Sequence, residues 1–213
     1  MPEHVFEIVV ALCAGIGLAA AAGIRAFLPL LAVSIGSRLG LIDLNPGLEF
    51  LSTDLALIAL IVATLLEIGS DKVPVVDNML DVVSTFLRPI AGFVAAMAMF
   101  GDLPQPIAIA VALVMAVVSL GTQVGRAKAR LGSTATTGGL ANPLLSTAED
   151  AVSGTLSFLA IVLPILAGVA VLVMLWILWK VARSVHRVSV RRFGTAARSG
   201  RGTRDPMEIT PEP

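Results

Sequence analysis

LPQPIAIAVALVMAVVSLGTQVG, residues 103–125, is a run of 23 residues without a charged side chain. A second run, AVSGTLSFLAIVLPILAGVAVLVMLWILW, covers 29 uncharged residues at 151–179. A helix needs about 20 predominantly apolar residues to cross a bilayer, so the first run predicts one transmembrane helix. The second is too long for one untilted crossing. We favour two helices, near 148–162 and 165–181, joined by a turn at Pro164 and Gly168, with one kinked helix over 154–179 as the alternative.

The whole chain has the composition of a membrane protein. Charged residues make up 14% of the 213 residues, against roughly 25% in soluble domains, and the mean hydropathy is +0.91. Residues 8–24 and 55–66 supply further apolar helices, while residues 26–37 suffice only for a short or re-entrant helix. We therefore predict an all-α fold, a polytopic transmembrane helix bundle of about six or seven spans with proline- or glycine-broken helices, over residues 1–182.

The basic residues are distributed unevenly. Eight of the 15 Lys and Arg residues lie between Lys180 and Arg204. With the N-terminus outside and seven crossings, 13 of the 15 fall in the cytoplasm, the side on which Lys and Arg collect. We predict a multi-pass protein of the bacterial inner membrane whose residues 183–213 form a basic, disordered cytoplasmic tail. A cleaved signal peptide over residues 1–22 is the competing interpretation, but no Lys or Arg precedes the first apolar run.

A shift of 69 residues indicates an internal repeat. PVVDNMLDVVS at 74–84 then lies over PLLSTAEDAVS at 143–153, and each copy has an acid seven residues after its proline, at Asp81 and Asp150. This predicts a span, a polar loop and a proline-started helix in both of the regions 52–101 and 106–163. Many transporters are built from repeats, with their sites where interrupted helices meet. Chance similarity between short apolar segments is the alternative.

Residues 67–89, EIGSDKVPVVDNMLDVVSTFLRP, place ionisable side chains within an apolar region. On a helix, Asp77, Asp81 and Arg88 fall on one polar stripe. An unpaired charge at mid-depth in a bilayer costs at least about 2.5 kcal/mol, so the stripe must face other helices or water. It predicts either a site for an ion, proton or polar solute, or a salt bridge that only fixes packing. Arg25 and Lys72 are the expected partners of Asp81.

Residues 131–150, LGSTATTGGLANPLLSTAED, form a second polar segment, uncharged until Glu149. It predicts a break between helices whose free N–H groups, ahead of the helix at Pro143, could hold an anionic group. A plain cytoplasmic loop that turns at Gly138 and Gly139 is the alternative. The candidate residues for binding a substrate or ion are therefore Arg25, Lys72, Asp77, Asp81, Arg88, Thr136, Thr137, Gly138, Gly139, Asn142 and Asp150.

The sequence argues against several kinds of site. One cysteine, Cys13, and two distant histidines leave no His/Cys ligand spacing, and no Walker sequence, zinc-protease helix or nucleophile elbow occurs. We predict no enzyme, catalytic residue, cofactor or metal. The expected partners are membrane lipid and a second copy of the chain, which the GxxxG pairs Gly36/Gly40 and Gly121/Gly125 would contact. Nucleic-acid binding is not expected, because the tail has a single aromatic residue.

Three ordered motifs carry a resemblance to a known family. They are GIRAFLPLL at 23–31, EIGSDKVPVVDNMLD at 67–81 with RP at 88–89, and TTGGLANPLLS at 136–146 with ED at 149–150. Together they resemble a family of small bacterial integral membrane proteins classed as a domain of unknown function, over about residues 11–166. The resemblance implies a polytopic membrane protein and supplies no substrate, reaction or catalytic residue.

The leading functional hypothesis is a small transporter or channel for an ion or small polar solute. The alternative is a non-transporting membrane protein, such as a lipid-handling or assembly factor, whose polar motifs are structural. The first predicts that the polar stripe and residues 136–142 line one water-filled cavity that can be reached from both sides. The second predicts that the polar groups are dry and paired with one another.

Overall fold

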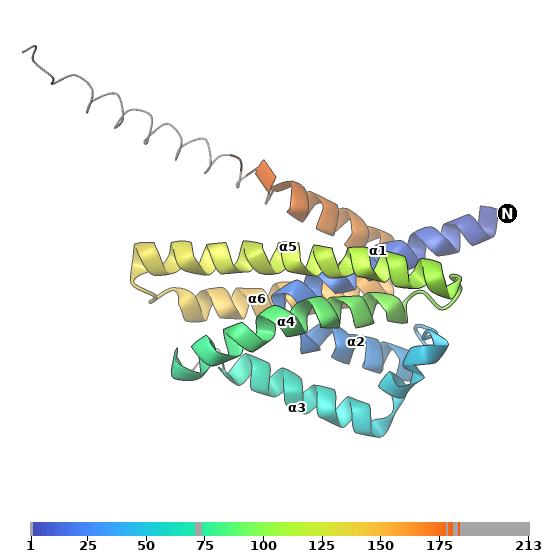
Figure 1. Ribbon diagram of the computed structural model, residues 1–213, viewed down its shortest axis with the longest axis horizontal. Helices are drawn as coiled ribbons and strands as arrows, with labels where there is room; N and C mark the ends of the chain where they lie inside the picture. Colours follow the sequence, from blue (N-terminus) through green and yellow to red (C-terminus); the bar gives the residue numbers. More distant parts are fainter. Residues whose placement is uncertain (1, 71–73, 178, 181–182, 184–213) are drawn as a thin grey trace, which may run out of the picture. The chain divides into compact units, whose positions relative to one another are not determined.

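The computed structural model describes residues 2–70, 74–177, 179–180 and 183, with the side chains of all of these except 2–3 and 74–84. Every element in these ranges is helical, as an all-α fold predicts. The helices are α1 (Pro2–Ile24), α2 (Phe27–Arg38), the 3₁₀ helix η1 (Pro46–Ser52), α3 (Asp54–Ser70), α4 (Pro74–Ala98), α5 (Gln105–Thr137) and α6 (Asn142–Val162), followed by a helix over Pro164–Ile177 (Figure 1). Residues 1–173 form one compact unit and residues 174–213 a second.

α1 is the central helix of the first unit, and it packs against α2, α4, α5 and α6. Residues 18–22, one leucine and four alanines, have an exposed fraction of 0%. Their small side chains let the neighbouring helices approach closely. At Gly23, an added Cβ would lie 1.7 Å from Oγ1 of Thr122 in α5. The first span predicted from residues 8–24 is therefore the core of the fold, and glycine at position 23 sets the distance to α5.

α2 and α3 pack on each other, and the turn before η1 joins them to the end of α4. Asn45 fixes this turn, since its Oδ1 accepts from the N–H of Gly47 at 3.1 Å and its Nδ2 donates to the carbonyl of Phe100 at 3.2 Å. α2 has 12 residues, which is about 18 Å of helix. A short helix was predicted over residues 26–37 and is confirmed. Whether it re-enters or crosses the membrane stays a prediction.

The helices have the lengths and surfaces of a membrane protein. His4–Ile24 and Gln105–Thr137 are each long and apolar enough to cross a bilayer, and η1 with α3, bent by 70°, would make a third span. Apolar side chains point outward along α3 and α5, with Leu55 80% exposed and Val117 64% exposed. A large exposed apolar surface marks contact with lipid or with another protein. The predicted total of six or seven spans is not established by these helices and stays a prediction.

The long apolar stretch at 151–179 is broken at its proline. α6 ends at Val162, and the next helix begins at Pro164, a residue suited to a first helical turn because it lacks an N–H. A Cβ added at Gly17 would lie within 3.0 Å of the Cβ atoms of both Ala160 and Ala167. Residues seven apart in a straight helix are separated by about 10 Å along its axis, so the contact with Gly17 favours the predicted turn over one kinked helix.

The glycines of the two GxxxG pairs have different surroundings. Gly36 packs against Ile161 of α6, and Gly40 lies beyond α2 with a φ of +70°. This pair therefore serves a contact within the chain and a helix end. At Gly121, on the exposed side of α5, a Cβ would meet no described atom within 4 Å. A contact between copies of the chain at Gly121 stays a prediction.

Both prolines of the predicted repeat begin helices, Pro74 in α4 and Pro143 in α6. Both helices pack on α1 and run in the same direction, because α1 to α6 alternate in direction along the chain (Figure 1). These features are those expected of a repeat. A symmetry axis that relates residues 52–101 to 106–163 stays a prediction.

Candidate functional site

Buried polar side chains gather where α1 ends. Arg25 follows the last residue of α1, and its side chain is completely buried. Its Nε lies 2.6 Å from Oδ1 of Asp150, and its guanidinium donates to Oγ of Ser146 at 2.8 Å and to the carbonyl of Glu67 at 3.5 Å. We name Arg25, Glu67, Ser146 and Asp150 the Arg25 cluster. It joins α1, α3 and α6 at one point.

The Glu67 side chain holds the beginning of α2. One carboxylate oxygen accepts from the N–H of Ala26 at 2.8 Å and the other from the N–H of Phe27 at 3.1 Å. The first N–H groups of a helix have no partner within it and carry partial positive charge, so a carboxylate stabilises them. Ala26, at the N-cap of α2, has no side chain that could cap the helix. Glu67 supplies that cap from α3.

A second ion-paired group lies one residue before Asp150. Nε of Arg126 donates to Glu149 Oε2 at 2.7 Å, and Arg130, one turn further along α5, donates to both oxygens of the same carboxylate. The Arg126 and Glu149 side chains are only 4% and 8% exposed. Charge-assisted hydrogen bonds are strong in such surroundings. Arg126, Arg130 and Glu149, the Glu149 cluster, therefore tie the polar end of α5 to α6.

Arg88, in α4, is also buried. Its carbonyl accepts a hydrogen bond from Oγ of Ser119 at 2.8 Å. One turn on, a Cβ added at Gly92 would lie 2.7 Å from Cβ of Ser119. Arg88 was predicted to share a polar stripe with Asp77 and Asp81, but the side chains of both acids lie outside the described residues, as does all of Lys72.

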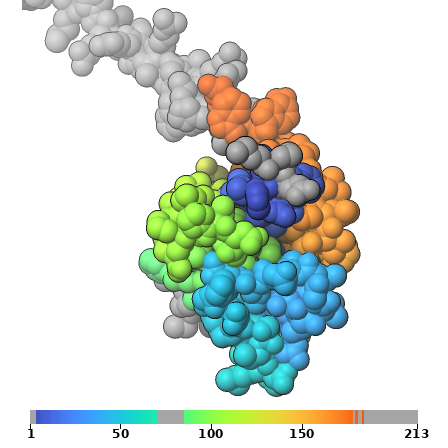
Figure 2. Space-filling model, turned by 90° about the vertical axis from the view of Figure 1, so that its right-hand side faces the viewer, coloured from blue at the N-terminus to red at the C-terminus, as the bar shows by residue number. Residues whose placement is uncertain are grey.

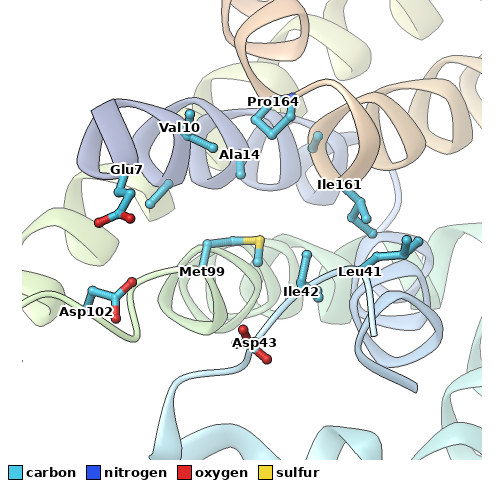
Figure 3. Close-up of a pocket in the computed structure, with 12 residues that line it drawn as sticks. Glu7, Val10, Ala14, Leu41, Ile42, Asp43, Met99, Asp102, Ile161 and Pro164 are labelled. Carbon is cyan, nitrogen blue, oxygen red and sulfur yellow. The ribbon is translucent and has the colours of Figure 1, made fainter. Parts of the chain in front are cut away.

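A pocket of about 260 Å³ lies at the opposite end of α1. Figure 3 shows the three carboxylates that line it, Glu7 on α1, Asp43 in the loop after α2 and Asp102 in the loop after α4, around apolar side chains such as Met99. No Lys, Arg or His is among the lining residues. Figure 2 looks onto this end, where the dark blue start of α1 lies between green α5 and the light-orange end of α6. We name this the acidic pocket.

The acidic pocket and the Arg25 cluster are separated by close packing. Ala14 lines the pocket, and Arg25 lies 11 residues further along α1, which is about 16 Å of helix. The fully buried residues 18–22 lie between them. Thr122 of α5 and Ser153 of α6 donate hydrogen bonds to backbone carbonyls of this stretch, at Ala20 and Ala21. The two polar regions are thus joined by α1 and kept apart by a closed core.

Comparison with known proteins gives a family but no function. The family described as a domain of unknown function, DUF4126, matches residues 12–184. The chain belongs to the DUF4126 family. No curated protein and no solved structure matches it. The family match confirms the expected resemblance to an uncharacterised family, and with the apolar helices it indicates a membrane protein.

The three sequence motifs meet only in part. Arg25, Asp150 and Ser146 come together, whereas residues 136–142 connect α5 to α6 in an exposed turn. α5 continues to Thr137, and Gly138 and Gly139 follow with φ of +62° and +89°. Oγ1 of Thr136 and Oγ1 of Thr137 donate to carbonyls of the preceding turn, and Asn142 Nδ2 donates to Thr134 Oγ1 at 3.2 Å. This arrangement favours the plain-turn alternative for Gly138 and Gly139.

Sequence reasoning missed several members of the two clusters, namely Glu67, Arg126, Arg130, Ser146 and Glu149. Glu67 and Glu149 belong to the motifs that carry the family resemblance, but Glu67 was considered only as the start of the segment 67–89 and Glu149 only as the first charge of the segment 131–150, with no partner for either. An acid at the end of one span and an arginine at the end of another can mark an interhelical pair, and that signal was present in the sequence. Among the described residues, no group of three or more His, Cys, Asp or Glu side chains could hold a metal ion.

Proposed function

We propose that the chain is a multi-pass membrane protein that takes up a small cation or cationic solute at the acidic pocket and moves it across the membrane. The observation that carries this proposal is the placement of an acid-lined pocket and a closed, ion-paired cluster at opposite ends of the same central helix. α1 connects the pocket at Ala14 with the buried guanidinium of Arg25.

The charge of the pocket supports a cationic substrate. Glu7, Asp43 and Asp102 contribute three carboxylates and no lining residue offsets them. A cleft lined by charges of one sign raises the local concentration of ions of the opposite sign. The volume of about 260 Å³ lies below the 300–1,000 Å³ that is typical of pockets for drug-sized molecules. The three carboxylates do not form a group that could coordinate a metal ion directly, so the pocket would hold a hydrated cation or a small amine by charge and size.

The Arg25 and Glu149 clusters support a closed gate on the other side. Many transporters alternate between states in which one side is open while ion pairs and packed helices close the other. In the predicted topology the acidic pocket faces outward, and both clusters lie at the cytoplasmic ends of their helices. The alanine-rich stretch of α1 would form the barrier between them, and small side chains allow neighbouring helices to shift against it.

Flux of cations into liposomes containing the purified protein tests the proposal. We expect a panel of Na⁺, K⁺ and methylammonium to show protein-dependent uptake of at least one member. The triple variant Glu7→Gln, Asp43→Asn and Asp102→Asn should lose this uptake, because the amides keep the shapes and remove the charge. Glu49→Gln, an exposed acid of η1 outside the pocket, is the matched control and should retain it. Uptake that is absent from the wild type, or unchanged in the triple variant, overturns the proposal.

A second candidate function is a non-transporting scaffold. The observation that favours it is that the described ionic side chains of the Arg25 and Glu149 clusters are paired with one another and largely buried. A scaffold predicts no cation uptake by the wild type. It also predicts that Asp150→Asn lowers thermal stability without any other measurable effect. A wild type that moves cations and loses this activity on Asp150→Asn contradicts the scaffold.

A further inference from the structure

We infer that two tryptophan–cation pairs near the end of the last apolar helix form an anchor for anionic lipid headgroups. The ammonium group of Lys180 lies 4.9 Å from the ring centroid of Trp176, and the guanidinium of Arg183 lies 4.4 Å from that of Trp179. Both distances are within the range of attraction between a cation and an aromatic face. This inference does not depend on whether the chain transports anything.

The four residues that form these pairs are all helical in the described part of the chain. Positions 176, 179, 180 and 183 follow the spacing i, i+3, i+4 and i+7, which brings side chains onto a single stripe. In each pair the cation lies one turn beyond its ring in the chain direction. Along the stripe, the rings therefore precede the charges. A helix that leaves a bilayer passes through the apolar edge of the interface first and the headgroups next, and the order of these side chains matches that sequence of layers.

The chemistry of these side chains fits a lipid surface. Trp176 and Trp179 are 57% and 55% exposed. Leu172 and Val173, which come just before them, are 61% and 50% exposed. Indole rings favour the membrane–water interface, where their apolar body and polar N–H are both accommodated. Lys and Arg extend their charged ends from apolar surroundings towards headgroups.

The charge of the following sequence selects anionic lipid. No Asp or Glu occurs from Ala151 to Arg204, while eight Lys and Arg residues occur from Lys180 to Arg204. A basic cluster directly after a membrane helix is attracted to phosphatidylserine- or phosphatidylglycerol-type headgroups. The exposed rings, the paired cations and the absence of acids together assign the partner as an anionic membrane surface.

The composition allows a direct test, because Trp176 and Trp179 are the only two tryptophans and the chain has no tyrosine. Intrinsic fluorescence of the full chain therefore reports on these positions alone. We expect the emission, in phosphatidylcholine vesicles, to be quenched more by lipid brominated near the headgroup than by lipid brominated near the chain end. Adding phosphatidylglycerol should shift the emission to shorter wavelength, and salt should reverse that shift.

The double variant Lys180→Gln and Arg183→Gln should lose the shift caused by phosphatidylglycerol but retain shallow quenching by brominated lipid. Lys128→Gln, which removes an exposed positive charge from α5, is the matched control and should behave as the wild type. Three results overturn the inference: strongest quenching by the deeply brominated lipid, quenching by aqueous iodide but by neither lipid, or an unchanged shift in the double variant. The depth measurement on the wild type stands even if a variant fails to fold.

Discussion

Replacing Asp150 with Asn tests the energetic role of the Arg25 cluster. The change removes a carboxylate that lies 2.6 Å from Nε of a completely buried arginine. Removing one partner of a buried ion pair costs about 3–5 kcal/mol, because the remaining charge loses the partner that offsets its desolvation. The Asp150 side chain is 25% exposed, so water can solvate part of the site. We therefore expect the lower limit, a loss of about 3 kcal/mol in the free energy of unfolding.

The chain contains a matched control for this experiment. Arg38 and Asp54 also approach to 2.6 Å, but their side chains are 35% and 83% exposed. An exposed pair contributes about 0–1 kcal/mol, so Asp54→Asn should have little effect. Both variants would be unfolded in mixed micelles by titration with a denaturing detergent, with helix content followed by circular dichroism. Equal losses in the two variants would refute the argument that burial makes the Arg25 pair important.

Three further predictions concern packing, capping and topology. Gly23→Ala should destabilise the protein by about 3 kcal/mol in the same titration, because the new Cβ would lie 1.7 Å from Oγ1 of Thr122. Gly121→Ala, where a Cβ meets nothing within 4 Å, should be neutral or stabilising by about 1 kcal/mol, and a large loss there would contradict the packing seen at α5. Glu67→Ala should cost about 1–2 kcal/mol in the same titration, since two N–H groups at the start of α2 lose their acceptor; an unchanged midpoint would exclude the cap. With the native cysteine removed, a cysteine at position 128 should be shielded from an impermeant thiol reagent in intact cells, and labelling from outside would reverse the predicted orientation.

The sequence was sufficient to predict that the elements are helices. It was less reliable for the residues at which each helix ends. Residues 103–125 were predicted as a span because they are uncharged, but α5 continues to Thr137. The first charge after the apolar run was taken as the end of the element. In the fold, Arg126 and Arg130 instead meet Glu149 of α6, and this pairing allows the helix to continue. Charge marks the boundary of an apolar run, which need not be the boundary of the helix.

The candidate site was predicted by residue but not by pairing. Arg25 and Asp150 were both selected, yet Arg25 was expected to meet Asp81, whose side chain lies outside the described residues. The observed contact with Asp150 joins positions 125 residues apart, and a single sequence holds no information on such a pairing. Glu67 was missed for a related reason. Helix caps are sought among the residues just before a helix, whereas this cap comes from a helix 40 residues later.

The long separation between Arg25 and its partners has a consequence for how the protein is made. Ser146 follows Arg25 by 121 residues, and ribosomes add about 5–20 residues per second, so roughly 6–24 s pass between the synthesis of the two. In the predicted topology, the first helix enters the membrane during that time, while its arginine lacks both Ser146 and Asp150. Its position after the last residue of α1 keeps the guanidinium near water until α6 arrives. A nascent chain halted before residue 146 would hold this helix in the bilayer with its alanine face uncovered, and such a fragment is an expected substrate for quality-control proteases.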